Sequence, residues 1–168
     1  MGKLLNFIVL PMAASDKDGI AEFFLNEADF ASSLLPFNPQ ALEEWKSFEG
    51  LKLRSKKIVL TIRLDTFLES MATDRVDFLK IDTQGADFSV IRSAGAYLER
   101  IREVILEVDI GTTHLYKGAA GRDDVIEYMN DRGFKLSKAE TQSEGKEQNL
   151  TFIPKFNKRV AKGSSANG

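Results

Sequence analysis

Short apolar runs alternate with amphipathic stretches along most of the 168-residue chain. Apolar or β-branched runs bounded by Gly, Pro or acidic residues predict strands at 7–10, 21–25, 57–64, 76–81, 103–110, 134–137 and 150–153. Helical spacing predicts helices capped by Asp65, opened by Gly85, and running from Asp123 or Asp124 to a terminating Gly133, with one or two helical turns over 41–48. Strands alternating with helices indicate βαβ units and a mostly parallel sheet. The final helix–strand–loop–strand order adds one antiparallel strand to it.

Composition narrows the possible classes of protein. The chain is 43% hydrophobic with a net charge of −2, which is incompatible with global disorder. It has no Cys and one His, which excludes disulfide scaffolds, Cys-ligated metals and most multi-His metal sites. The near-neutral charge lacks the excess of basic residues that is typical of nucleic-acid-binding proteins. No apolar run approaches the ~18 residues of a membrane span, and the N-terminal run lacks signal-peptide features, so we expect a cytoplasmic protein.

The length corresponds to one domain or part of one. We expect residues 1–154 to form a partial α/β domain. Residues 155–168 form a basic tail with four Lys or Arg and no acid, and they end in GSSANG. A tail of this composition is typical of disorder, and we interpret it as solubilising rather than as a nucleic-acid or membrane contact.

Candidate chemistry gathers where predicted strands end. In open α/β sheets, ligands bind beyond the carboxyl ends of the strands. Three segments follow such ends: residues 82–85, residues 109–112, and the turn at residues 14–16. Right-handed crossovers would bring these segments to one rim of the sheet. His114 in the loop after the 109–112 segment is either a catalytic base or an exposed loop residue, and Tyr116 either lines the cleft or packs at the sheet edge.

Two charges interrupt strands that should be apolar. Lys80 and Glu107 each lie two residues before a strand-end Asp, so Lys80 shares a face with Asp82 and Glu107 with Asp109. If the two strands are level neighbours, Lys80 lies beside Glu107, and buried charges are expected to be paired. We favour a polar floor beneath a ligand, made of Lys80, Asp82 and Glu107. A structural ion pair or an edge strand with a solvated face are the alternatives.

Asp82 is the leading candidate within this set. A strand-end carboxylate can act as a general base for a hydroxyl, as an acceptor for a ligand ammonium, or as a metal ligand. It can equally cap the helix that follows. These roles stay open at this point.

The stretch DFLKIDTQGADFSVIRSAGAYLERIREVILEVD resembles the signature of the FkbM family of S-adenosylmethionine-dependent methyltransferases. AASDKDGIAEFFLNEADFASSL and TIRLDTFLE are similar to upstream elements of that family. LYKGA, DDVIEYMNDRGFKL and NLTFI match its closing part in order and spacing. The resemblance spans roughly residues 7–153.

This resemblance implies a Rossmann-like methyltransferase sheet, S-adenosylmethionine as donor, and a hydroxyl acceptor on a sugar, glycan, lipid or small metabolite. Ala14 and Ser15 would lie by the adenine. Asp82 would lie beside the methionine end or the acceptor, and Glu107 in the fifth strand of the family's sheet. We therefore expect Asp82, Glu107 and Lys80 to be catalytic, and Ala14, Ser15 and Asp82 to bind the donor, with no metal.

One departure from the family pattern matters. The sequence has no glycine-rich turn of the V-D-x-G-A-N type and no following strand that ends in an acid. We expect a sheet that lacks its first one or two strands, with an exposed edge prone to pair with another copy. We also expect donor binding in the millimolar range or weaker.

Three interpretations stay open: part of a longer methyltransferase, an inactive module that binds a partner or a glycan, and an unrelated receiver-like α/β domain. The order of the final elements makes the third the weakest.

Overall fold

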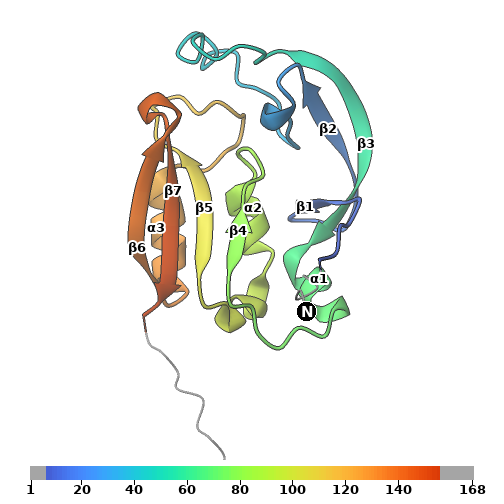
Figure 1. Ribbon diagram of the computed structural model, residues 1–168, viewed down its shortest axis with the longest axis vertical. Coiled ribbons are helices and arrows are strands. Elements are labelled where there is room, and N and C mark those ends of the chain that lie inside the picture. The colour runs from blue at the N-terminus through green and yellow to red at the C-terminus, as the bar shows by residue number, and fades with distance from the viewer. Residues whose placement is uncertain (1–6, 156–168) are drawn as a thin grey trace, which may run out of the picture.

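Two β-sheets lie side by side in the computed structural model, which describes residues 7–155 (Figure 1). The first sheet has the strand order β1-β3-β2, and the second has the order β4-β5-β7-β6. The strands are β1 (Ala13–Ser15), β2 (Gly19–Asn26), β3 (Leu53–Arg63), β4 (Leu79–Ile81), β5 (Val104–Asp109), β6 (Phe134–Gln142) and β7 (Glu147–Pro154). The helices are α1 (Leu64–Ser70), α2 (Asp87–Arg92) and α3 (Arg122–Asp131), with 3-10 helices η1 (Asp29–Ala31), η2 (Gly95–Arg100) and η3 (Ser143–Gly145).

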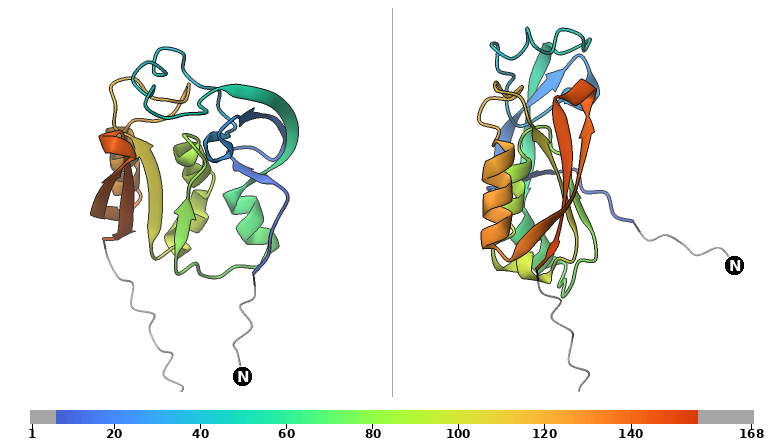
Figure 2. Two further views of the ribbon diagram at one scale, coloured as in Figure 1. Left: turned by 45° about the horizontal axis from the view of Figure 1, so that its top comes forward. Right: turned by 90° about the vertical axis from the view of Figure 1, so that its left-hand side faces the viewer.

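The four-stranded sheet has one apolar and one polar face. Strand side chains alternate between faces, so the buried Val104, Leu106 and Val108 of β5 point to one side. Helices α2 and α3 cover that side (Figure 2). Their apolar side chains, such as Ile91 and Met129, are fully buried against it. Among the described residues, no helix covers the opposite face. This polar face carries Lys80, Glu107, Asn149, Glu147 and Gln142.

The prediction of a single, mostly parallel sheet is wrong for the described residues, and a Rossmann-like sheet is not confirmed, whereas the predicted antiparallel strand at the C-terminal end is present as β7. β1–β3 and β4–β5 pair in parallel, whereas β2–β3, β5–β7 and β6–β7 pair antiparallel. Most pairs are antiparallel because β2 pairs with β3, and β7 pairs with both β5 and β6. The polar stretch 138–149, predicted as a loop, instead extends β6 and β7 and turns only around η3, because its polar side chains tolerate a solvated strand. The coarser expectation of a mixed α/β architecture is confirmed.

Several local predictions need correction. Residues 7–10 are not a strand, since the first strand starts at Ala13. Their apolar side chains are exposed because no strand pairs with them. Residues 41–48 form turns rather than a helix. Asp65 lies inside α1, whose N-cap position is Arg63, and accepts hydrogen bonds from the Arg63 guanidinium and the Thr66 backbone N–H.

Other predictions are confirmed. Strand β2 covers its predicted run, and β3 and β5 match theirs to within one residue at the ends, except that β3 starts at Leu53. Strand β4 is shorter than the predicted 76–81 and includes only Leu79–Ile81. Helix α3 ends just before Gly133, whose φ of 83° is the left-handed conformation expected of a glycine after a helix. In residues 7–155, no helix is both long and apolar enough to cross a membrane. The basic tail lies outside the described residues, apart from Lys155.

Candidate functional site

A cleft of about 410 Å³ opens between the two sheets. Its size lies in the range typical of small-molecule sites, roughly 300–1,000 Å³. Ala14 of β1 lines one side of it and Asp82, at the carboxyl end of β4, lines another. The cleft therefore brings together two of the candidates expected from the sequence. Its lining residues are Pro11, Met12, Ala13, Ala14, Phe23, Ser32, Leu34, Val59, Asp82 and Thr83.

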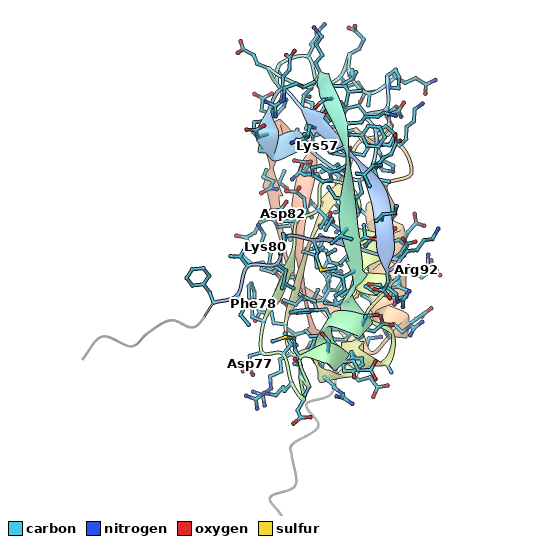
Figure 3. The ribbon with its side chains drawn as sticks, turned by 90° about the vertical axis from the view of Figure 1, so that its right-hand side faces the viewer. Lys57, Asp77, Phe78, Lys80, Asp82 and Arg92 are labelled. Atoms are coloured by element: carbon cyan, nitrogen blue, oxygen red, sulfur yellow. The ribbon has the colours of Figure 1, made fainter. Side chains whose placement is uncertain are left out.

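Both oxygens of the Asp82 carboxylate accept a hydrogen bond. Lys80 Nζ lies 2.6 Å from Oδ2 and Gln84 Nε2 lies 2.9 Å from Oδ1. Figure 3 shows Lys80 and Asp82 along one side of the molecule, while Arg92 of α2 lies on the opposite side. This contact with Asp82 raises the pKa of Lys80. Asp82 is thus oriented by its neighbours while about 37% of its side chain stays exposed to solvent.

The predicted buried ion pair between Lys80 and Glu107 is wrong. Lys80 lies opposite Ile105 on β5, so Glu107 is offset by two residues. The Lys80 side chain is 47% exposed and pairs with Asp82 instead. β4 is the edge strand of its sheet, so its polar face is solvated, as in one of the alternatives considered above. Lys80, Asp82 and Glu107 do share a face, but Lys80 is not a buried member of a polar floor.

Glu107 lies in a strongly acidic environment. Burial, together with the nearby carboxylates of Glu147, Asp82 and Asp87, raises its pKa to about 8. Its two oxygens accept hydrogen bonds from two different side-chain amides, Gln142 Nε2 and, at 3.4 Å, Gln84 Nε2. Near neutral pH this carboxyl can therefore exist in both protonation states, which is a property suited to proton transfer.

The Asp87 carboxylate links the loop after β4 to β5 by hydrogen bonds. It is 2% exposed and accepts hydrogen bonds from the backbone N–H of Thr83 at 3.2 Å, from the Thr83 hydroxyl at 3.1 Å and from the backbone N–H of Glu107 at 3.3 Å. Burial raises the pKa of Asp87. Sequence reasoning did not assign this residue a role, although an acid in the first turn of a helix after a strand is a recognisable signal.

Ser33 was not foreseen as part of the site, whereas Gln84 was included only as a member of the 82–85 segment and Tyr116 only as one of two alternatives. The Tyr116 hydroxyl lies 3.2 Å from Gln84 Oε1, and the Ser33 hydroxyl donates to the Gln84 carbonyl at 2.7 Å. Gln84 and Gly85 have φ values of 53° and 87°. A Cβ on Gly85 would lie 2.8 Å from the Tyr116 Cβ, so the loop can approach this ring only with glycine there.

Three other candidates take structural positions. Asp109 accepts hydrogen bonds from the backbone N–H groups of Gly111 and Leu115, at 2.7 and 2.8 Å, and so folds its own loop. His114 Nδ1 lies 3.7 Å from Asp109 Oδ1 without a hydrogen bond. Ser15 is buried at the end of β1 and does not line the cleft, unlike its neighbour Ala14. Within residues 7–155, no group of three or more His, Asp or Glu side chains is arranged to hold a metal.

Comparison with known proteins agrees with the resemblance seen in the sequence. A family model described as "Methyltransferase FkbM domain" matches residues 3–136. No curated protein and no solved structure matches the chain.

Proposed function

The chain belongs to the FkbM methyltransferase family, and we propose that it transfers a methyl group from S-adenosylmethionine to a hydroxyl oxygen of a sugar, glycan, lipid or small metabolite. The observation that carries this proposal is the shared cleft of Ala14 and Asp82 between the two sheets. Asp82 follows β4 directly, at the strand end where α/β folds bind ligands.

The lining of the cleft fits part of the donor. Small or apolar side chains such as Ala13, Ala14 and Val59 offer a surface for a flat base. Asp82 adds a carboxylate on a different part of the wall. The sequence contributes no glycine-rich turn for the donor's methionine end and no strand-end acid for its ribose, so the fit covers the adenine and the reacting end only. S-adenosylmethionine, when bound, supplies a methyl group attached to a positively charged sulfur.

We assign proton handling to the carboxylates of Asp82, which follows β4, and Glu107, which lies within β5. Methylation of a hydroxyl would form a carbon–oxygen bond while the carbon–sulfur bond of the donor breaks and a neutral thioether leaves, so the hydroxyl proton must also leave. Asp82 faces the cleft, is oriented by Lys80 and Gln84, and can accept this proton or hold the hydroxyl in line. Glu107, whose pKa is about 8, is the neighbouring group able to exchange the proton with solvent near neutral pH.

A radiolabel transfer assay tests the proposal. The chain is incubated with S-adenosylmethionine carrying a tritiated methyl group and with panels of sugars, glycans and lipids. We expect label in one acceptor class and at least a tenfold loss of transfer in Asp82→Asn. Asp77→Asn is the matched control, because Asp77 pairs with Arg75 and Arg102 and is not part of the cleft lining. Equal loss in both variants would contradict the role of Asp82.

A second candidate is a methyltransferase-like module that binds a partner or glycan without catalysis. The cleft lining offers the donor an apolar surface and one carboxylate only, which is compatible with binding without transfer. Glycan binding that is unaffected by the donor, together with no transfer to any panel, would support this alternative. The division into a domain over 1–154 and a tail over 155–168, pairing of copies through an exposed sheet edge, the use of Ser15 and the cytoplasmic location stay predictions.

A further inference from the structure

The Gln84 side chain joins three polar groups from different parts of the chain. Its Nε2 donates to Asp82 Oδ1 at 2.9 Å and lies 3.4 Å from Glu107 Oε2. Its Oε1 accepts from the Tyr116 hydroxyl at 3.2 Å. One amide thus connects the carboxylates at the ends of β4 and β5 with a largely buried tyrosine.

We propose that Gln84 is a positioning residue that holds the carboxylates of Asp82 and Glu107 in a fixed arrangement at the edge of the cleft. This inference rests on the proposed function for its purpose, but its geometry does not depend on the donor or the acceptor. Each N–H of the amide has a carboxylate within reach, and a carboxylate accepts but does not donate when ionised.

The orientation of the amide follows from its neighbours. The Tyr116 hydroxyl has one hydrogen, which it shares between the Ala31 carbonyl at 2.9 Å and Gln84 Oε1 at 3.2 Å. Rotating the amide by half a turn would place Oε1 2.9 Å from Asp82 Oδ1, where two acceptors repel each other. The carboxylates of Asp82 and Glu107 therefore select the orientation in which the amide N–H groups face them, and the Tyr116 hydroxyl can donate to Oε1 in that orientation.

The backbone of Gln84 is held as firmly as its side chain. Its φ of 53° lies in the left-handed region, which residues with a Cβ rarely adopt. The Ser33 hydroxyl binds the Gln84 carbonyl at 2.7 Å and so stabilises this conformation. Strain at a residue that contacts two candidate catalytic carboxylates is typical of a functional loop.

Besides the uncharged amide of Gln84, several charged groups lie near Glu107. Lys80 and Asp82 belong to β4 and its end, Asp87 to α2, and Glu147 to β7. Gln142 of β6 donates to the other oxygen of Glu107. Because three of these groups are acids, loss of the Gln84 donor should make the ionised form of Glu107 less favourable still.

NMR of the side-chain carboxyl groups in the 168-residue chain tests this inference. The side-chain ¹³C signals of Glu107 and Asp82 are titrated in the wild type, in Gln84→Met and in Gln40→Met. Met keeps the length of Gln without its donors, and Gln40 is an exposed glutamine whose side chain makes no hydrogen bond that the structure records. We expect the Glu107 midpoint to rise by about 0.5–1 pH unit in Gln84→Met only. Unchanged midpoints in a folded Gln84→Met would overturn the proposal.

A wild-type measurement covers the case in which Gln84→Met fails to fold. The two Nε2 protons of Gln84 should lie downfield of those of the exposed Gln40 and should move with the Glu107 titration. Gln84 protons that match those of Gln40 and are insensitive to pH would refute the inference. Neither measurement involves S-adenosylmethionine, so a negative transfer assay and a negative titration are separate results.

Discussion

The four-stranded and three-stranded sheets differ in how much of their surface they bury. In the first, Val104, Leu106, Leu150 and Phe152 are fully buried against α2 and α3. In the second, Ile20, Ile58 and Leu60 share one face and are 71%, 66% and 52% exposed. Ile20 and Leu60 are cross-strand partners, so they form one apolar patch on the β2–β3 hairpin.

This difference bears on the candidate site, because the cleft has walls from both sheets. Asp82 and Glu107 belong to the well-packed sheet, whose side-chain network fixes their geometry. Ala14 belongs to the sheet that buries less. Stability and catalytic geometry should therefore reside mainly in the four-stranded sheet, with the donor's base contacting the less buried one.

The largest expected contrast is between two isoleucines. Ile91 on α2 is fully buried, so Ile91→Ala should lower the free energy of unfolding by about 2–5 kcal/mol. Ile58→Ala on β3 removes the same atoms from an exposed position and should change it by less than about 0.5 kcal/mol. Urea denaturation measures both. Equal losses would contradict the contrast between the sheets.

The loop that carries the site gives the next effect. Gly85→Ala combines a left-handed φ with a close contact to Tyr116 and should destabilise by about 2–4 kcal/mol. Gly118 has a similar φ of 83° but nothing within 4 Å of its Cβ position. Gly118→Ala should therefore lower the free energy of unfolding only by the cost of a left-handed φ for alanine, about 1–2 kcal/mol. Thermal unfolding of both variants would show whether the Tyr116 contact adds anything.

A pH-dependent effect is expected at Glu107. Its pKa rises from 4.5 to about 8 on folding, so between these values the folded chain holds a proton that the unfolded chain has lost. Stability from this group is therefore present below pH 4.5 and falls as pH rises toward 8. The wild type loses this stability as pH rises, and Glu107→Gln does not. The free energy of unfolding of Glu107→Gln relative to the wild type should therefore be about 1–2 kcal/mol higher at pH 8 than at pH 4.5, after allowing for partial solvent screening. Glu22→Gln, which removes an exposed carboxyl on β2, is the comparison variant.

The smallest effect concerns Lys80. Its contact with Asp82 is half exposed, so Lys80→Met should change stability by less than about 1 kcal/mol. Lys56→Met removes a similarly exposed contact with Glu22 on the other sheet and should behave alike. A loss of several kcal/mol for Lys80→Met alone would restore the buried-pair interpretation that the strand register argues against.

Much of the four-stranded sheet could be predicted from the sequence. Its apolar runs are bounded by clear breakers, and the 3.6-residue spacing of α3 ends at Gly133. Residues 7–10 were mispredicted because four apolar residues before a proline read as a strand whether or not a partner strand exists. The extent of β6 and β7 was missed because solvated strands carry polar residues that also suit loops.

The candidate site was predictable in part. Asp82 could be found because strand ends in α/β folds are functional positions. The register of β4 against β5, which separates Lys80 from Glu107 by two residues, could not be found, because it leaves no mark in the sequence. The role of Gln84 was missed for a related reason. This role depends on Tyr116, Ser33 and Glu107, which are distant in sequence and meet only in the fold.

A donor titration tests the central claim, that the cleft between the sheets is where S-adenosylmethionine binds. ¹H–¹⁵N spectra of the labelled chain are recorded up to about 10 mM donor, which is sufficient for the expected millimolar dissociation constant. We predict shifts centred on Met12, Ala14, Asp82 and Thr83, weakened by Asp82→Asn and unaffected by Asp77→Asn. Shifts confined to other parts of residues 7–155, or no shifts at all, would contradict the account.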